Sequence, residues 1–284
     1  MDSKEFGLVA AQQLFKVEDL HYGFWDNHEE ATLNNWKKAQ EKHTKFLFKH
    51  IFDYIKGTSK SETRLLDIGC GVGVTTKKLL ELDYRVDGLV PYKWMADYAS
   101  KLTSDYKDEF RGDIYDCKFE DFPIEQLKQR YDIAFFSESY QYVDMIKSFK
   151  VLDQILKDNG IVIIFDFFKR DDVTGKSPLG GGHSMNSFYS MVKDYNYSIK
   201  VDKDITKNVS PNLKLVNEVL VERILPFSDT FDKFMETRNK KIYSFIKWVL
   251  RKRISKMSFK YSNSRNEENF IKYKSYRLIV LSKN

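Results

Sequence analysis

Three glycines at alternate positions follow a short apolar run in the first third of the chain. The segment Leu65–Gly73 reads LLDIGCGVG, and a helical pattern comes directly after it. Glycine lets the chain turn sharply and lets a ligand approach the backbone, while the first turn of a helix offers unpaired N–H groups. The pattern therefore predicts a strand, a tight turn and a helix that together bind a nucleotide-like ligand.

The spacing of the glycines distinguishes between two kinds of nucleotide site. A dinucleotide-binding turn reads Gly-x-Gly-x-x-Gly, with the third glycine needed where the helix packs on the strand. Counted from Gly69, that third glycine falls on Val74, whereas Gly71 and Gly73 continue a strict alternation. A turn that binds a diphosphate bridge is therefore not indicated.

A doubly wound α/β core is expected to position this turn. Short apolar segments alternate with helical patterns, and strands separated in this way must be parallel, joined by right-handed crossovers. The last of these segments is apolar almost throughout, as in strands that are buried on both faces. The expected strands are residues 64–68, 85–90, 114–119, 131–137 and 161–168.

The pattern changes after the fifth expected strand. A helix is expected from near Ser184, a strand at residues 198–206, helical structure over 211–263 with a break at Pro226, and a last strand at 276–282. A helical insert between two strands predicts a cap over the sheet edge where ligands of such folds bind.

Three parts of the chain follow from this organisation. We expect residues 1–56 to form an N-terminal helical lid, residues 57–209 and 274–284 to form the core, and residues 210–273 to form a helical substrate cap.

The turn after Asp67 resembles motif I of the class I S-adenosylmethionine-dependent methyltransferases. The order of the expected elements is also similar to that family over most of the chain, which implies its Rossmann-like seven-stranded sheet with five parallel strands and a final antiparallel hairpin. The segments His21–Trp25, Ser137–Ser139 and Asp204–Pro211 resemble the branch that contains tocopherol and glycine-sarcosine type methyltransferases, with cyclopropane fatty acid synthases as relatives.

This resemblance implies S-adenosyl-L-methionine as the cofactor. The implied cofactor contacts are Tyr22, Asp67, Gly69, Cys70, Gly71, Gly73, Val90, Pro91, Phe119, Glu120 and Ser137. Two positions depart from the family pattern. Val90 stands where an acidic residue usually binds the ribose hydroxyls, and Lys118 stands near the acidic position that meets the adenine amine, which leaves backbone contact and Glu120 for that role.

Four residues are candidates for contact with the acceptor or its proton: His183, Glu138, Tyr22 and Tyr142. His183 follows three glycines in the loop after the fifth strand, and Glu138 follows the fourth strand, where an unpaired carboxylate is hard to explain by packing. In relatives the N-terminal segment folds over the cofactor, which implies that Tyr22 closes on the sulfonium. Tyr142 replaces a histidine of the family pattern. Packing is the structural alternative for both tyrosines, and a helix-cap role is the alternative for His183.

Methyl transfer is an in-line displacement at a sulfonium carbon, so alignment is the main task of the protein and is worth about 7–11 kcal/mol in favourable systems. A base is needed only where the acceptor loses a proton. We expect a small hydrophobic or aromatic acceptor that is methylated on oxygen. The alternatives are methylene transfer to a lipid alkene as in cyclopropane synthases, a non-catalytic binding module, and methylation of a macromolecule.

Charge and composition limit the other classes of function. The chain carries a net charge of +6, but residues 238–284 hold fourteen Lys and Arg against two Asp and Glu. Apolar residues lie among these basic ones. The segment is therefore interpreted either as a peripheral membrane contact or as a cap helix packed on the core. Nucleic acid is not an expected partner because no separate binding motif accompanies the charge.

Two cysteines and five histidines lack the spacing of a zinc site, so no metal is expected. No apolar run reaches the length of a membrane span, and the N-terminus does not read as a secretory signal. A cytoplasmic location is therefore the expectation, and the oligomeric state stays open.

Overall fold

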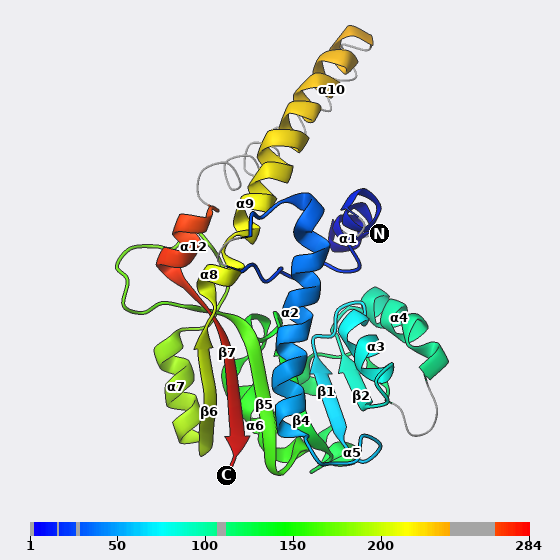
Figure 1. Ribbon diagram of the computed structural model, residues 1–284, viewed down its shortest axis with the longest axis vertical. Coiled ribbons are helices and arrows are strands. Elements are labelled where there is room, and N and C mark those ends of the chain that lie inside the picture. Colours follow the sequence, from blue (N-terminus) through cyan, green and yellow to red (C-terminus); the bar gives the residue numbers. More distant parts are fainter. Residues whose placement is uncertain (1–2, 16, 27–28, 107–111, 239–264) are drawn as a thin grey trace.

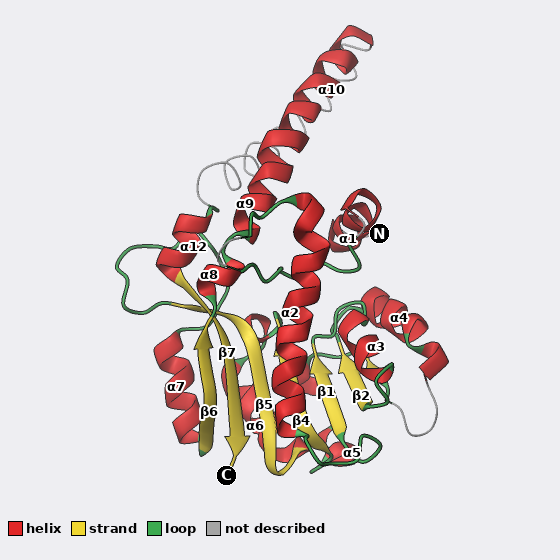
Figure 2. Ribbon diagram, viewed as in Figure 1, coloured by secondary structure: helices red, strands yellow, loops and turns green. Residues whose placement is uncertain are grey.

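The computed structural model describes residues 3–15, 17–26, 29–106, 112–238 and 265–284. A seven-stranded sheet lies at its centre in the order β3-β2-β1-β4-β5-β7-β6, with helices on both faces (Figures 1 and 2). The strands are β1 (Arg64–Ile68), β2 (Arg85–Leu89), β3 (Ile114–Tyr115), β4 (Tyr131–Ser137), β5 (Leu156–Lys169), β6 (Tyr197–Asp204) and β7 (Lys274–Lys283). The first five are parallel, and β7 runs antiparallel to both of its neighbours, β5 and β6. The predicted fold class is confirmed.

Helices join and cover these strands. The longer ones are α1 (Ser3–Phe15), α2 (Leu33–Tyr54), α4 (Lys93–Leu102), α6 (Met145–Ile155), α7 (Met185–Asp194) and α10 (Leu225–Arg238). The shorter ones are α3 (Val74–Leu80), α5 (Ile124–Leu127), α8 (Thr206–Val209), α9 (Asn212–Asn217) and α12 (Glu267–Tyr273). Single 3-10 turns lie at Ser104–Tyr106, Phe119–Asp121 and Tyr140–Tyr142, and a π-helix spans Glu218–Ile224.

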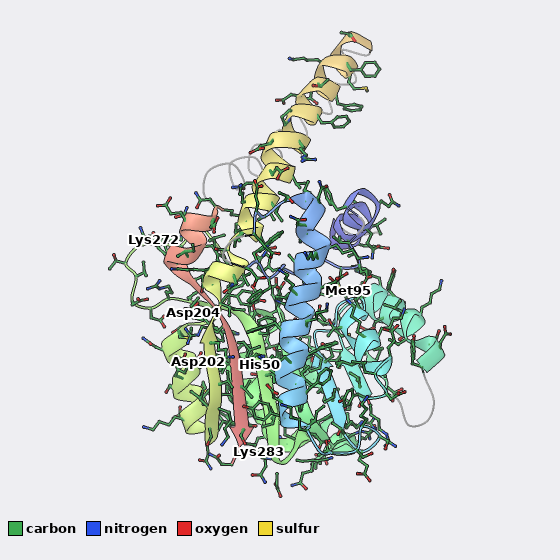
Figure 3. All side chains as sticks on the ribbon, in the orientation of Figure 1. His50, Met95, Asp202, Asp204, Lys272 and Lys283 are labelled. Atoms are coloured by element: carbon green, nitrogen blue, oxygen red, sulfur yellow. The ribbon has the colours of Figure 1, made fainter. Side chains whose placement is uncertain are left out.

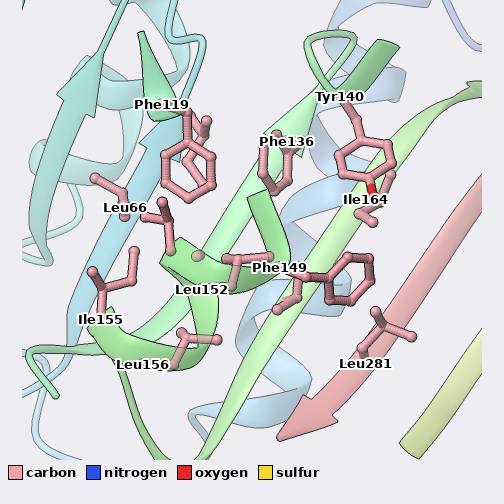
Figure 4. Packing of buried hydrophobic residues seen from close by; sticks show 14 of the residues in the cluster. Leu66, Phe119, Phe136, Tyr140, Phe149, Leu152, Ile155, Leu156, Ile164 and Leu281 are labelled. Atoms are coloured by element: carbon pink, nitrogen blue, oxygen red, sulfur yellow. The ribbon is translucent and has the colours of Figure 1, made fainter. Parts of the chain in front are cut away.

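Both faces of the sheet are buried, which explains the apolar sequence of its strands. Along β4, Ile133 and Phe135 belong to the apolar cluster that α2 and α3 cover, whereas Ala134 and Phe136 belong to the cluster under α5, α6 and α7 (Figure 4). Full burial of a side chain of this size contributes about 1.5–3 kcal/mol. The helix α2 is thus one layer of the core as well as part of the N-terminal segment.

The third strand is shorter than the sequence predicts. Only Ile114 and Tyr115 pair with β2, and the chain then turns so that Phe119 enters the core, where its ring meets the edge of Phe136 with centroids 5.5 Å apart. Burial of that aromatic ring takes precedence over strand formation at residues 116–119. The prediction of a strand over 114–119 is therefore wrong in its second half.

The predicted break at Pro226 is also wrong. The chain stays helical from α9 through the π-helix into α10, and Pro226 is the second residue of α10. The wider π turn directly before Pro226 changes the hydrogen-bond register at this point, which accommodates a residue without an N–H inside a continuous helix. Figure 1 shows α10 extending away from the body of the molecule. The remainder of the expected helical segment, residues 239–263, lies outside the described residues, as does most of the basic stretch considered for membrane contact.

No helix in the described ranges is both long enough and apolar enough to cross a bilayer.

The antiparallel strand β7 is inserted between β5 and β6. Arg277 on β7 donates from Nε to Asp202 at 2.8 Å and from an outer nitrogen to Asp204 at 3.2 Å, and both carboxylates lie along β6 (Figure 3). This insertion brings the start of β7 to the edge of the sheet where the parallel strands end.

A buried ion pair joins β1 to β2, and a tyrosine hydroxyl from β4 binds the same carboxylate. Arg64 donates to Asp87 through Nε at 3.0 Å and through an outer nitrogen at 3.1 Å, and the Tyr131 hydroxyl donates to the same carboxylate at 2.7 Å. The Asp87 side chain has no solvent exposure. Removing one member of such a pair leaves an uncompensated charge in the interior.

Arg64→Met should lower the free energy of unfolding by about 3–5 kcal/mol, because Asp87 would lose its two-point partner inside the sheet. Urea denaturation followed by tryptophan fluorescence measures this loss. Lys93→Met is the matched control, since Lys93 pairs with Asp97 at 3.0 Å on an exposed helix face and its removal should leave the midpoint unchanged. Equal midpoints for both variants would show that the Arg64–Asp87 pair does not stabilise the folded protein.

Candidate active site

A cavity of about 780 Å³ opens where β1, β2 and β4 end. Ligands of open α/β sheets bind at this carboxyl edge. Most of the residues expected in the site line it: Asp67, Gly69, Cys70, Gly71, Val90, Pro91, Phe119, Glu120, Ser137, Glu138 and Tyr142. The topology therefore brings together residues that are up to 75 positions apart, from four different connections.

The three glycines of the turn have different surroundings, although all have positive φ angles of 79°, 58° and 85°. A Cβ on Gly69 would lie 2.4 Å from the Cβ of Ser139, and one on Gly73 would lie 2.9 Å from the Cβ of Ala99. A Cβ on Gly71 would meet nothing within 4 Å. Gly71 therefore presents open backbone to the cavity, whereas Gly73 is needed for close packing of α3 on α4 and does not line the cavity.

The carboxyl of Asp67 lies under the turn. It is buried, and it accepts a hydrogen bond from the hydroxyl of Thr76 on α3 at 2.8 Å. Burial raises the pKa of Asp67 to about 7. This carboxyl both fixes the start of α3 and forms part of the cavity wall.

The end of β2 carries no acidic side chain. Val90 is buried there, and Asp87 is committed to Arg64 three residues earlier. Near the adenine position expected from the sequence, Glu120 lines the cavity and accepts the N–H of Asp144 at 2.6 Å. The wall at β2 is therefore apolar.

Glu138 is the most constrained residue of the site. It follows β4 directly and has a φ of 58°, a conformation that a side chain such as glutamate adopts only at a cost. Its N–H donates to the carbonyl of Phe165 at 2.9 Å, and its Oε1 accepts the N–H of Tyr22 at 3.0 Å and the hydroxyl of Tyr276 at 2.9 Å. Burial, followed by the charge of Asp166, raises the pKa of Glu138 to about 8.

Asp166 on β5 is a second buried carboxyl beside this site. Its oxygens accept hydrogen bonds from the backbone N–H of Gln141 at 3.0 Å and from that of the next residue, Phe167, at 2.7 Å. Burial raises the pKa of Asp166 to about 7. The sequence reasoning missed it, although a single carboxylate within the apolar run at residues 161–168 was the available signal.

The two candidate tyrosines occupy different places. Tyr142 lines the cavity with 79% of its surface exposed. Tyr22 does not line the cavity, because its ring turns to the edges of Phe270 and Tyr276, with centroids 6.3 and 6.2 Å away. Burial raises the pKa of the Tyr22 hydroxyl. The backbone of Tyr22, through its bond to Glu138, is what reaches the site.

His183 does not face the cavity, so that expectation is wrong. Its Nε2–H donates to the carbonyl of Tyr140 at 3.0 Å, and its ring meets the Tyr140 ring edge-on at 5.2 Å between centroids. The N–H of Lys169 donates to the His183 carbonyl at 2.7 Å, which extends the strand pairing past β5 and holds this loop behind Tyr140. The alternative reading as a structural loop residue fits these contacts.

Several lining residues were not foreseen. They come from the N-terminal segment, the first turns of α3 and α4, and the turn after β4: Leu8, Asp19, Leu20, Thr75, Tyr92, Met95 and Val143. Met95, which lies on α4, is labelled in Figure 3. The hydroxyl of Ser139 donates to the carbonyl of Ile68, which ties the end of β4 to the glycine turn.

Comparison with known proteins supports the architecture. Residues 66–164 match the family described as a methyltransferase domain. A malonyl-[acyl-carrier protein] O-methyltransferase from Acetivibrio thermocellus is 28% identical over 120 residues, which are 41% of this chain and 40% of that protein. The chain thus matches less than half of the length of this relative.

Two solved structures resemble nearly the whole chain. A putative sarcosine dimethylglycine methyltransferase from Galdieria sulphuraria has a TM-score of 0.72 at 15% identity and covers 100% of this chain and 99% of its own. Geranyl diphosphate C-methyltransferase from Streptomyces coelicolor A3(2), in complex with Mg²⁺, geranyl diphosphate and S-adenosyl-L-homocysteine, has a TM-score of 0.66 at 14% identity over 100% and 98% of the two chains. At these identities the likeness shows the fold. Residues 66–164 therefore match a methyltransferase domain, and the chain as a whole shares the fold of these two solved methyltransferases.

Proposed function

We propose that this protein is a methyltransferase that uses S-adenosyl-L-methionine and acts on a small hydrophobic or aromatic acceptor. The observation that carries the proposal is a single cavity wall that joins the open backbone of Gly71 to the partly buried carboxyl of Glu138. The first feature suits a cofactor that lies against the backbone, and the second suits an acceptor that loses a proton. The similar Streptomyces coelicolor structure contains S-adenosyl-L-homocysteine, which supports the same cofactor here.

The residues around the turn would hold this cofactor. Open backbone at Gly71 and the apolar wall of Val90 and Pro91 leave room for an adenosyl group, and Phe119 contributes to the lining near its base. When bound, the cofactor supplies an electrophilic methyl group on a positively charged sulfur. The protein then has to align an acceptor with that methyl group, which is the largest part of the catalysis.

Glu138 supports oxygen as the target atom. A hydroxyl or phenol must lose its proton as the new bond forms, and a general base works best when its pKa lies near the working pH. Glu138 has a pKa of about 8 and lines the cavity. Leu20, Tyr92 and Val143 make the surrounding surface apolar or aromatic, which suits an acceptor of that kind.

Two other functions are separated from this one by simple measurements. Methylene transfer to a lipid alkene, as in cyclopropane synthases, would remove a double bond from the product. A non-catalytic binding module would bind a ligand at the site without forming any methylated product.

Incubation of the protein with a cell extract and methyl-labelled S-adenosyl-L-methionine should place the label in a small molecule that carries a new methyl group on oxygen. Mass spectrometry of the small-molecule and macromolecular fractions locates the label. A heat-treated sample of the protein is the control. Label found only in lipids that have lost an alkene, only in macromolecules, or in no product would refute the proposed reaction.

Gly71→Leu should abolish binding of S-adenosyl-L-methionine, since the new side chain would project into open space that lines the cavity. Isothermal titration calorimetry measures the affinity. Gly57→Leu is a matched control, because Gly57 also has a positive φ, of 85°, and open surroundings but lies outside the cavity lining. Both variants carry the same backbone strain of about 1–2 kcal/mol. Unchanged affinity in the Gly71 variant would mean that the turn does not hold the cofactor.

Glu138→Gln should lose about 10²- to 10⁴-fold in transfer rate and should also change the dependence of stability on pH. The folded state raises the pKa of Glu138 to about 8, so ionisation of this carboxyl lowers stability progressively as the pH rises from about 4.3 to about 8. The variant lacks this loss. Its free energy of unfolding relative to the natural chain should therefore rise by about 1–4 kcal/mol between pH 4.5 and 8.

Urea denaturation at the two pH values measures that difference. A constant difference between the two proteins across this range would show that Glu138 does not titrate as a buried carboxyl.

A further inference from the structure

We infer that His43 and Tyr276 are positioning residues for Glu138. They hold its Oε1 in contacts with the protein, so that the other oxygen, Oε2, can receive the proton of the acceptor. The inference rests on the proposed function, because it assigns that proton transfer to one atom. Neither residue lines the cavity, and both are buried, with 1% and 0% of their surfaces exposed.

The contacts of the Glu138 carboxyl are all on one side. Oε1 accepts the N–H of Tyr22 at 3.0 Å and the hydroxyl of Tyr276 at 2.9 Å, and it lies 3.5 Å from Nε2 of His43. No hydrogen bond from the described part of the chain reaches Oε2. Because Glu138 lines the cavity and 16% of its side chain is exposed, the unused oxygen is the one that a bound molecule can meet.

The direction of the hydrogen bonds follows from the groups present. The Tyr276 hydroxyl has two acceptors within reach, Glu138 at 2.9 Å and the carbonyl of Phe165 at 3.4 Å, and the carboxyl is the nearer. The phenol oxygen then has a lone pair for Nε2 of His43 at 3.0 Å. These partners assign the imidazole proton to Nε2, so that His43 donates to Tyr276 and Tyr276 donates to Glu138.

The imidazole of His43 is suited to act as a neutral hydrogen-bond donor in a fixed orientation. It stacks on Phe165 with ring centroids 4.1 Å apart and on His21 with centroids 5.0 Å apart, which hold the plane of the ring. Burial, with a smaller effect of His21, lowers the pKa of His43 well below its usual value. A neutral ring has one N–H, and here it is directed at the phenol oxygen.

The backbone of Glu138 gives a second reason to assign a function to this arrangement. A φ of 58° costs a residue with a side chain stability, and such strain persists where several surrounding contacts fix the conformation. Tyr22, His43 and Tyr276 come from the N-terminal segment, from α2 and from β7. Groups from the chain before α2, from α2 and from β7 thus converge on the carboxyl of one residue whose backbone is strained.

As the O–H bond of the acceptor breaks, its proton binds Oε2 of Glu138 and its electron pair stays on the acceptor oxygen, which forms the new bond to the methyl carbon. The S–CH₃ bond breaks and its electron pair stays on sulfur, which becomes neutral. The hydrogen bonds to Oε1 favour the charged carboxylate and offset part of the effect of burial and of Asp166 on its pKa.

Tyr276→Phe tests the arrangement without an acceptor. Difference infrared spectra against Glu138→Gln give the midpoint at which the Glu138 carboxyl loses its proton. Loss of one hydrogen bond to the carboxylate should raise that midpoint by about one to two pH units. Tyr189→Phe is the matched control, since Tyr189 donates to Asp202 at 2.5 Å outside the cavity, and it should leave the midpoint unchanged. The other charged or titratable groups facing Glu138 are Asp166, Asp19, Tyr22 and Tyr142, which all variants retain.

Histidine variants provide an independent test. His43→Leu should also raise the midpoint, by less than Tyr276→Phe, whereas His43→Gln keeps an N–H donor and should restore part of the difference. If Tyr276→Phe does not fold, this pair decides the question. A midpoint within about 0.3 pH units of the natural value in both Tyr276→Phe and His43→Leu would overturn the inference.

Calorimetry with S-adenosyl-L-methionine separates this inference from the proposed function. Natural protein, Tyr276→Phe and His43→Leu should bind the cofactor within threefold of one another, because neither residue lines the cavity. If none of them binds, the proposed function fails, whatever the infrared midpoints. If all bind and the midpoints do not move, the positioning role fails and the proposed function stands.

Discussion

A carboxyl group in a largely apolar wall needs partners for its oxygens, and in this molecule that requirement brings distant parts of the chain together. Oxygen Oε1 of Glu138 takes hydrogen bonds from Tyr22, near the N-terminus, and from Tyr276, near the C-terminus. His43 on α2 supports the second of these bonds. The site therefore depends on β7 lying next to β5, because only that insertion carries Tyr276 to the end of β4.

The same constraint extends to the helices above the sheet. Asn212, at the start of α9, accepts the N–H of Gly23 at 2.8 Å and donates to the Gly23 carbonyl at 2.7 Å. The N–H of Trp25 donates to the carbonyl of Asn208 on α8 at 2.8 Å. The segment that contacts Glu138 through Tyr22 is thus fastened to the helices that follow β6. The segment before α2 and the helices α8 and α9 therefore form one hydrogen-bonded unit.

The parts of the site that sequence reasoning predicted are those that one local segment encodes. The turn at Asp67–Gly73 and the residue after β4, Glu138, are set by strand ends and glycine spacing, which are legible in the sequence. His43 and Tyr276 are 233 positions apart, and no local pattern joins them. His183 failed for a related reason, since the glycines before it indicated a loop near the cavity, whereas its long-range contact with Tyr140 decides where it lies.

The features of the site that lower stability are confined to a few residues, whereas the interactions that stabilise the fold are distributed over the whole core. Strain at Glu138 and the burial of two carboxyls lower stability in one place, whereas apolar burial on both faces of a seven-stranded sheet is spread over the whole core. Net stability of a domain is small, about 5–15 kcal/mol, so such costs persist only where a function retains them. A neutral side chain of the same shape at position 138 is therefore expected to give a more stable fold than the natural glutamate.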